Sequence, residues 1–599
     1  MSAEAWRLAP RPASLAAVLL ALVAPSATAA PQPIPEGPGV EALPAFVGAP
    51  ATPRPVFATE PPRHPFMAPN GKSNIHVDAW QTDRNRWFGP LGRGTTRNSS
   101  FQSADCASHT FDRRGRLITV CVGLQGPRLV MFDPDTLDEL ARFQMPPRQL
   151  QAGGNPNPFT NFSGGGYFYL DQNDRSVVPT TTRHVWVVAE AGDSGFTLQR
   201  DYDLSGAVPF GDAIISALPD WSGRIWFASV DGVVGTVDPS SGAVRSRALG
   251  EPISNSFTVD ERGAVYIVTD RAMYRFRAAS DGTPATVWRK LYENDGQKKS
   301  GQTQAGSGTT PSVTPSYVAI TDNADPVNVV VYRRRDGGFV CKAPLFGQGQ
   351  SSTDNSLIAT DRSLVAENNH GYTGPAATEQ GKSTVGGVER VDIRAGGRCR
   401  KVWHSDERAP SSVPKLSLAN GLVYAYTKEP RSDGQDAWYL TAIDFHSGRT
   451  VFKRLAGEGL GFNNNYAPVT LASDGDAYVG VLGGLVRLAD AVSPAQSPLR
   501  LRLALRYRRG SRGCARGAVR ATVGGRDREA LRAADFSLGG RRVARDRRRP
   551  FGTRIAAARL RDGRRYAVRA DVRSADGRRA RLARGVRACA AARAPHFTG

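Results

Sequence analysis

The sequence predicts an all-β protein made of a long repeat array followed by a smaller β domain with a very different surface. The first observation is a recurring phrase: an apolar run, a polar turn with Asp or Gly, and a second apolar run rich in Val, Ile, Tyr and Trp. The second is the location of the charge. From Arg500 onward the chain holds 30 arginines, no lysine and seven acidic residues, which accounts for the whole net charge of +23. The preceding 499 residues are neutral, so two domains are expected.

The repeated phrase predicts the architecture of the first domain. Its copies are spaced by roughly 43 to 60 residues, the period expected of four-stranded propeller blades. Such a unit cannot bury its apolar face alone, so the copies are expected to stack around an axis. Eight blades are predicted, and seven is the alternative because the fifth and sixth copies are the least regular. The copies begin at Ala107, Gly166, Ala213, Ser256, Pro311, Asn355, Lys415 and Ala467.

The N-terminus has the pattern of an export signal. Arg7 and Arg11 precede an apolar run at 15–23, and small residues at 27–30 supply a cleavage site. No other segment is long enough to be a transmembrane helix. The prediction is a cleaved signal peptide over residues 1–30 and a secreted, extracellular protein, and a retained N-terminal anchor is the alternative. Residues 31–72 are rich in Pro and Ala and predict an extended, partly disordered linker.

Export favours disulfide bonds between the six cysteines, for which fifteen pairings exist. One preferred pair brackets a single hairpin and another brackets the C-terminal domain. Metal binding by cysteine is disfavoured, because no CxxC or Cys/His spacing occurs. The preferred pairs are Cys106 with Cys121, Cys341 with Cys399, and Cys514 with Cys589.

Outer-strand phrases lie between the repeated hairpins, such as GVVGTVDPSSGAVRSRAL from Gly232. With inner phrases such as SDGDAYVG, they resemble the repeats of quinoprotein-like (PQQ-type) and gluconolactonase-type β-propellers. The resemblance covers most of residues 100–490 at the level of repeats, and it implies the fold rather than the chemistry. The propeller is expected over residues 73–490. The segment NIHVDAWQTDRNRWFGP, from Asn74, is expected to supply outer strands to the last blade.

Residues 497–590 alternate apolar residues with arginine, as in LRLRLALRY from Leu499, which is typical of amphipathic strands. The phrases DFSLGGRRVARDRRRPF and RYAVRADVRSADGR resemble bacterial immunoglobulin-like (Ig-like) β-sandwich modules. A small Ig-like sandwich is therefore expected. Its arginine rows are expected to form a solvated charged face. The alternative is that they bind a cell-surface polyanion such as teichoic acid or anionic lipid headgroups. Nucleic acid is not an expected partner of an exported domain with so few aromatic residues, and a monomer is expected.

Polar residues concentrate where innermost strands begin, and in a propeller these positions line the central channel. Carboxylate and amide oxygens suit Ca²⁺, and the resemblance implies that such residues, from separate blades, hold this ion. The alternative is that they satisfy turns at strand ends. The candidate ligands are Asp212, Asn255, Asp354, Glu367, Asn368 and Asn465, and further polar residues of the same kind are Asp105, Asn355, Lys415 and Asn463.

Two classes of function follow. The first is a ligand-binding or scaffold protein at the cell envelope, with an unidentified small-molecule or surface ligand. The second is a secreted enzyme with its site in the channel, either a Ca²⁺-dependent lactonase-like hydrolase or a quinone-dependent dehydrogenase. His76 and Asp78, on one face of a strand, would be a general base and its orienter for hydrolysis. The favoured alternative is that both residues only form part of the ring-closing strand. PQQ is disfavoured because no adjacent cysteines occur, and the lack of any GxSxG elbow favours the first class.

Overall fold

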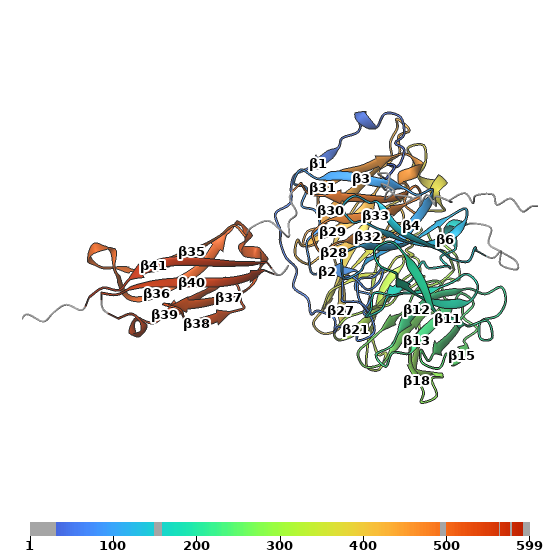
Figure 1. The fold of residues 1–599 in the computed structure, drawn as a ribbon, viewed down its shortest axis with the longest axis horizontal. Helices are drawn as coiled ribbons and strands as arrows, with labels where there is room; N and C mark the ends of the chain where they lie inside the picture. Colours follow the sequence, from blue (N-terminus) through green and yellow to red (C-terminus); the bar gives the residue numbers. More distant parts are fainter. Residues whose placement is uncertain (1–30, 149–157, 492–498, 562, 575–577, 591–599) are drawn as a thin grey trace, which may run out of the picture. The chain divides into compact units, whose positions relative to one another are not determined.

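The computed structural model describes residues 31–148, 158–491, 499–561, 563–574 and 578–590 (Figure 1). The predicted signal peptide, residues 1–30, lies outside these described residues. In the described ranges, no helix is long and apolar enough to cross a membrane. The helices there are short 3-10 turns, and strands dominate. The turns are η1 (Val40–Ala42), η2 (Pro158–Thr160), η3 (Pro375–Thr378), η4 (Leu460–Phe462), η5 (Ser511–Gly513), η6 (Arg526–Ala530) and η7 (Ala557–Arg559).

The described residues before position 490 form eight sheets of four or more strands, which are antiparallel except where β2 joins β28. The sheets are numbered in chain order. Sheet 1 contains β4 (Ala104–Phe111), β5 (Leu117–Gly123), β6 (Gly126–Phe132) and β7 (Glu139–Gln144). Sheet 2 contains β8 (Tyr169–Leu170), β9 (Ser176–Pro179), β10 (His184–Glu190) and β11 (Phe196–Asp203). Sheet 3 contains β12 (Ile214–Pro219), β13 (Ile225–Ser229), β14 (Val233–Val237) and β15 (Val244–Ala248). Sheet 4 contains β16 (Thr258–Val259), β17 (Val265–Val268), β18 (Ala272–Ala278) and β19 (Pro284–Leu291).

The later sheets follow the same order, and the last two also take in N-terminal strands. Sheet 5 contains β20 (Ser312–Val313), β21 (Tyr317–Thr321), β22 (Asn328–Arg333) and β23 (Phe339–Pro344). Sheet 6 contains β24 (Ile358–Ala359), β25 (Ser363–Glu367), β26 (Val388–Arg394) and β27 (Arg398–Ser405). Sheet 7 contains β28 (Lys415–Ser417), β29 (Leu422–Thr427), β30 (Ala437–Asp444) and β31 (Thr450–Glu458), with β1 (Phe46–Gly48) at one edge and β2 (Arg84–Asn85) at the other. Sheet 8 contains β32 (Val469–Leu471), β33 (Ala477–Val481), β34 (Gly484–Ala489) and β3 (Thr96–Phe101).

The sheets pack face to face in sequence, which is the arrangement of a β-propeller. The buried apolar clusters join sheets 1 and 2, then 2 to 4, 4 and 5, 5 and 6, 6 and 7, and 7 and 8. A further cluster joins sheet 8 back to sheet 1, where the rings of Phe111 and Tyr478 meet edge to face at 5.5 Å. Inner strands such as β13, β14 and β17 are buried at every position, because a neighbouring sheet covers each face. This explains the apolar runs of the repeated phrase.

One expectation about closure was wrong. The outer strand of sheet 8 is β3, paired antiparallel with β34 from Thr96 opposite Ala489 to Phe101 opposite Gly484, and not the segment from Asn74. Residues Ser73–Trp87, called here the axial segment, lie instead against the innermost strands. Of its residues, only Arg84 and Asn85 form a strand, parallel to β28. The backbone groups of the axial segment form hydrogen bonds with several sheets, so the segment does not need to pair along its length with one strand.

Five backbone carbonyls of the axial segment, and the indole of Trp87, meet the sheets in chain order. The segment accepts a hydrogen bond from the amide of a residue in the innermost strand of sheets 2, 4, 5, 6 and 7, and donates one to sheet 8. The pairs are Leu170 N to Ser73 O (2.8 Å), Val259 N to Ala79 O (3.3 Å), Val313 N to Trp80 O (2.9 Å), Ala359 N to Thr82 O (2.9 Å), Leu416 N to Asp83 O (3.0 Å) and Trp87 Nε1 to Leu471 O (2.8 Å). The innermost strands therefore surround this segment.

Residues 31–72, expected as a partly disordered linker, are extended but bonded to sheet 7 and its surroundings. Strand β1 pairs with β31, and the amides of Arg54 and Val56 donate to Asn420 O (2.7 Å) and Leu418 O (2.9 Å). A proline-rich chain is extended by its fixed φ, and its remaining amides can still bond to a sheet edge.

The C-terminal domain consists of two antiparallel sheets around one core. The three-stranded sheet contains β35 (Leu501–Arg509), β36 (Ala515–Gly525) and β39 (Gly552–Ile555). The four-stranded sheet contains β38 (Arg541–Asp546), β37 (Leu531–Leu538), β40 (Arg565–Ser574) and β41 (Arg579–Arg587). Val519, Phe536 and Val568 are among the fully buried side chains between them. Alternation thus places one apolar face of each sheet inward, as the sequence pattern predicts.

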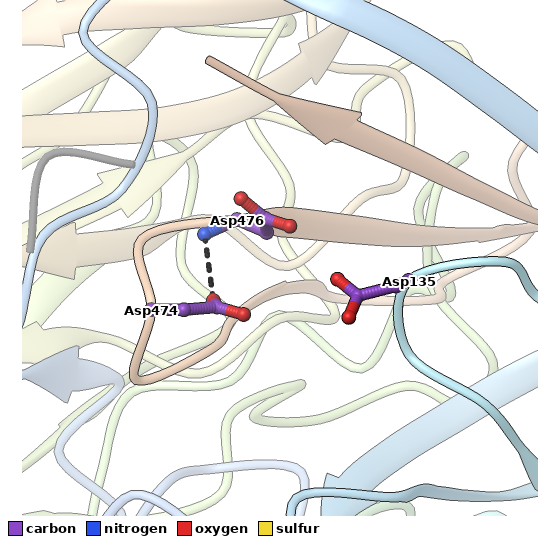
Figure 2. A group of neighbouring side chains, drawn as sticks. All are labelled: Asp135, Asp474 and Asp476. Atoms are coloured by element: carbon purple, nitrogen blue, oxygen red, sulfur yellow. Dashed lines mark hydrogen bonds between the residues drawn. The ribbon is translucent and has the colours of Figure 1, made fainter. Parts of the chain in front are cut away.

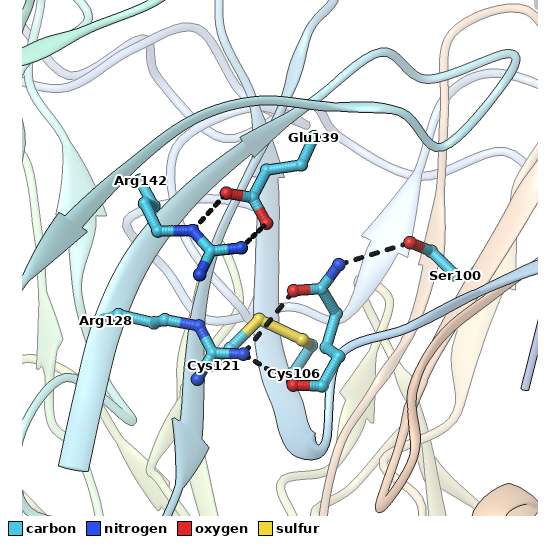
Figure 3. Close-up of a disulfide and its surroundings, with 7 residues drawn as sticks. Ser100, Cys106, Cys121, Arg128, Glu139 and Arg142 are labelled. Atoms are coloured by element: carbon cyan, nitrogen blue, oxygen red, sulfur yellow. Dashed lines mark hydrogen bonds and ion pairs between the residues drawn. A yellow bond between two sulfur atoms is a disulfide. The ribbon is translucent and has the colours of Figure 1, made fainter. Parts of the chain in front are cut away.

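The three predicted disulfides are present. Cys106–Cys121 joins β4 to β5, Cys341–Cys399 joins sheets 5 and 6, and Cys514–Cys589 closes 75 residues of the C-terminal domain. Figure 3 shows the first of these beneath the Arg128 guanidinium, which donates to the carbonyl of Gln102 at 2.7 Å.

Candidate functional site

A buried group of charges holds the axial segment in the channel. Asp83 Oδ1 lies 2.6 Å from Lys415 Nζ on β28, and Asp83 Oδ2 lies 3.1 Å from His76 Nδ1. All three side chains are at most 3% exposed. Burial acts to raise the pKa of Asp83, but Lys415 and His76 outweigh it and hold that pKa below its ordinary value. The Asp83 carboxylate is therefore ionised, and it bridges Lys415 on β28 and His76 in the axial segment.

His76 does not pair with Asp78 as expected. Asp78 accepts hydrogen bonds from Trp80 N (2.9 Å) and Thr82 Oγ1 (2.5 Å), so it closes a turn of the axial segment. Burial raises the pKa of Asp78 to about 7. The other nitrogen of His76, Nε2, lies 3.3 Å from Ser356 Oγ. Ser356, His76 and Asp83 therefore follow one another in the order found in serine hydrolases.

Glu367 is a second buried carboxyl group beside this cluster. Its Oε1 accepts hydrogen bonds from the side-chain amides of Asn355 and Asn369, the latter at 2.8 Å. Its Oε2 has no hydrogen-bond partner among the described residues. Burial raises the pKa of Glu367 to about 8, against the opposing effect of both amides and Lys415. With no metal ion beside it, the Glu367 carboxyl group is thus largely protonated at neutral pH.

Three of the predicted metal ligands meet around one small cavity of about 40 Å³ on the axis. Asn255 Oδ1 accepts from Tyr167 OH at 2.5 Å, and Asn465 Oδ1 accepts from Tyr372 OH at 3.0 Å. Asp354 Oδ2 accepts from Thr303, while its buried Oδ1 has no partner among the described residues. Burial raises the pKa of Asp354 to about 7. The cavity has room for a few water molecules.

The remaining candidates serve local structure. Asp212 Oδ1 accepts from the amides of Ala213 (2.7 Å) and Asp231 (3.0 Å). The Oδ1 of Asn368 accepts from the amides of Ser352 and His370. Its Nδ2 donates to the carbonyls of Gln350 and Gly386. Neither residue lines the axial cavity. The two side chains thus hold backbone groups of separate segments in place, with partners up to 19 positions away in sequence.

Within the described ranges, one group of three acidic side chains has the spacing of metal ligands. Asp135, from sheet 1, meets Asp474 and Asp476, from the turn between β32 and β33 (Figure 2). Arg487 offsets part of the negative charge of this group, because its guanidinium lies 3.0 Å from Asp135 and 2.7 Å from Asp476. Burial and the neighbouring Asp474 raise the pKa of Asp476 to about 6. The sequence could not reveal this group because its members come from both ends of the array.

A groove of about 780 Å³ lies at the junction of sheets 1 and 8. Its apolar lining includes Phe101, Leu124 and Leu460, which are 37%, 106% and 52% exposed. Asp105 and Arg148 also line it; burial raises the pKa of Asp105 to about 7, and the charge of Arg148 opposes that shift. The groove shares Ala107, Phe162, Gly166 and Asn465 with the axial cavity. The one residue whose local sequence could have indicated the groove is Leu124, because an apolar side chain is unusual in the tight turn between β5 and β6.

No protein-family model matches the chain. An uncharacterized protein of Archaeoglobus fulgidus is 28% identical in an alignment of 324 positions that covers 47% of this chain and 62% of the relative. The chain thus spans less than two thirds of that relative's length.

Similar solved structures include propellers of several kinds. BamB from Moraxella catarrhalis matches with a TM-score of 0.41 and 12% identity, over 62% of this chain and 92% of that one. The designed protein Ika8 matches with a TM-score of 0.40 and 14% identity, over 65% of this chain and 96% of that one. The C-terminal WD40 domain of Sif2 matches with a TM-score of 0.38 and 12% identity, over 64% and 95%. These scores are low, so the propeller assignment rests on the sheet order and packing described above.

Proposed function

We propose that the chain is an exported ligand-binding or scaffold protein whose ligand binds in the groove between sheets 1 and 8. In this proposal the eight sheets form a closed eight-bladed propeller, which agrees with the cluster that joins sheet 8 to sheet 1. The C-terminal domain is an Ig-like sandwich. The three disulfides agree with an extracellular location.

The observation that carries the proposal is the contrast between groove and channel. The axial segment fills the channel and leaves about 40 Å³, whereas the groove offers about 780 Å³. Small-molecule sites usually have a volume of about 300–1,000 Å³ and a mainly apolar lining with a few polar groups. The groove meets this description, with Asp105 and Arg148 as the polar groups. An amphipathic ligand, with an apolar body and a polar end, fits these surroundings.

The enzyme alternative is favoured by one observation, the order of Ser356, His76 and Asp83. A hydrolase must bring an acyl carbon within about 3.5 Å of the serine oxygen. Ser356 is 5% exposed and faces the 40 Å³ cavity, which cannot hold such a substrate. Labelling with a fluorophosphonate probe tests this alternative. We expect no adduct, and an adduct lost in Ser356→Ala would establish the hydrolase.

The groove is tested with the environment-sensitive dye 1-N-phenylnaphthylamine and the full chain. We expect the fluorescence increase to be lost in Leu124→Asp/Leu460→Asp. The matched control is Val287→Asp/Leu291→Asp, which removes exposed apolar side chains from β19 (45% and 69% exposed). Equal dye binding by both variants and the parent would refute ligand binding in the groove.

A further inference from the structure

The three-stranded sheet of the C-terminal domain presents an outer face made largely of arginine. The inward positions are apolar, for example Leu503, Val519 and Ile555. The outward positions of the same strands alternate with them and are exposed. The arginines at these outward positions, called here the arginine face, are Arg502, Arg506 and Arg508 on β35, Arg516 and Arg520 on β36, and Arg554 on β39.

These arginines lie directly opposite one another. Arg506 pairs across the sheet with Arg520, which in turn pairs with Arg554, and Arg508 pairs with Arg516. Directly opposed like charges destabilise a sheet. Neighbouring strands are about 4.8 Å apart and next-but-one residues about 6.8 Å apart, so the face is a dense two-dimensional array of positive charge.

No counter-charge relieves the array within the described part of the domain. Strands β35, β36 and β39 contain no acidic residue, and none of the six arginines forms an ion pair with a described residue. The four-stranded sheet differs, because Asp535 pairs with Arg545 and Asp571 with Arg581 on its strands. Both sheets are thus positive, but only the three-stranded sheet has strands with no acidic residue among the arginines.

We propose that the arginine face binds the surface of a lipid bilayer that contains anionic phospholipids. Guanidinium groups pair with phosphate through two parallel hydrogen bonds. Six of them spread over three strands can contact a plane of headgroups together, whereas a linear polyanion would follow only one row. The small outward residues Ala504 and Ala518 leave no bulky side chain between sheet and plane. Surface contact without insertion is therefore expected.

The test is flotation of the full chain with vesicles of phosphatidylcholine, with and without about 30% phosphatidylglycerol. We expect binding only with the anionic lipid, and release when salt is raised from about 0.1 M to about 0.5 M. Each surface arginine contributes about fivefold to such binding, so Arg506→Gln/Arg520→Gln/Arg554→Gln should weaken it by about 100-fold. Removing opposed charges should not unfold the sheet.

The matched control removes three arginines from the other sheet. Arg565, Arg569 and Arg573 are exposed on β40, so Arg565→Gln/Arg569→Gln/Arg573→Gln loses the same charge. This control should weaken binding less than about threefold. If the first variant fails to fold in a thermal melt, Arg502→Gln/Arg508→Gln/Arg516→Gln replaces it. Equal weakening by both triples would overturn the arginine face, and binding to soluble polyphosphate but not to vesicles would overturn the bilayer. Neither result bears on dye binding in the groove.

Discussion

Asp83 and Lys415 are 332 positions apart in sequence, yet their charged atoms lie 2.6 Å from one another in the channel. Asp83 also accepts a hydrogen bond from His76. The carboxylate therefore joins the axial segment to β28 and also joins two residues within the axial segment. The pair is fully buried, and a buried ion pair is held at the expense of desolvating both charges. Its value to the protein is that it fixes where the axial segment lies.

Removing one partner of this pair should therefore be costly. Lys415→Met leaves an uncompensated buried carboxylate, and we expect about 3–5 kcal/mol of destabilisation. Urea unfolding followed by tryptophan fluorescence measures it. Asp83→Asn/Lys415→Met should lose less than the sum of the single changes. The control is Lys342→Met, which removes an exposed ion pair with Glu293 and should cost less than about 1 kcal/mol. Equal losses in the two Lys→Met variants would contradict the prediction.

Stability should fall as the pH rises through neutrality. Burial raises the pKa of Glu367 from 4.5 to about 8, so between these values the folded state holds a proton that the unfolded chain has lost. The free energy of unfolding therefore decreases from about pH 4.5 and reaches its full loss above about pH 8. Melting temperatures between about pH 5 and pH 9 measure the slope. Glu367→Gln mimics the protonated form and should flatten it; an unchanged slope would show that Glu367 is already ionised.

The disulfide of the C-terminal domain should stabilise that domain alone. Cys514–Cys589 closes 75 residues, so Cys514→Ser/Cys589→Ser should cost about 2–4 kcal/mol. Calorimetry should show the melting transition of this domain at a lower temperature and the propeller transition unchanged. A common shift of both transitions would mean that the two parts unfold as one unit.

Calcium should not be needed for the propeller. One carboxyl group, Asp354, lines the axial cavity among the described residues, and its pKa of about 7 opposes ionisation. Ca²⁺ usually takes about six to eight oxygen ligands with several charges. We expect the melting temperature to agree within about 1 °C in Ca²⁺ and in EDTA. A stoichiometric ion in the purified protein, lost in Asp354→Asn, would restore the calcium proposal.

The sequence predicted what depends on local pattern. Alternating apolar residues and Asp-Gly turns located the hairpins, and the short Cys106–Cys121 separation gave the first disulfide. It could not predict where the axial segment lies, because its partners come from six different sheets. Spacing alone offered Asp78 as a partner for His76, whereas a turn of the axial segment brings Asp83 to it instead. The groove could not be predicted for the same reason, since Phe101, Leu124 and Leu460 meet only when sheets 1 and 8 pack together.

The axial segment constrains the order in which the protein can fold. Ser73–Trp87 leaves the ribosome early, but its hydrogen-bond partners extend from Leu170 to Leu471. Until nearly 400 further residues have followed, this stretch lacks most of the groups that its buried charges require. Contacts of such long sequence separation form slowly, because closing the loops between them costs entropy first. The axial segment is thus synthesised before the sheets that surround it, but it can reach its native position only after they have formed.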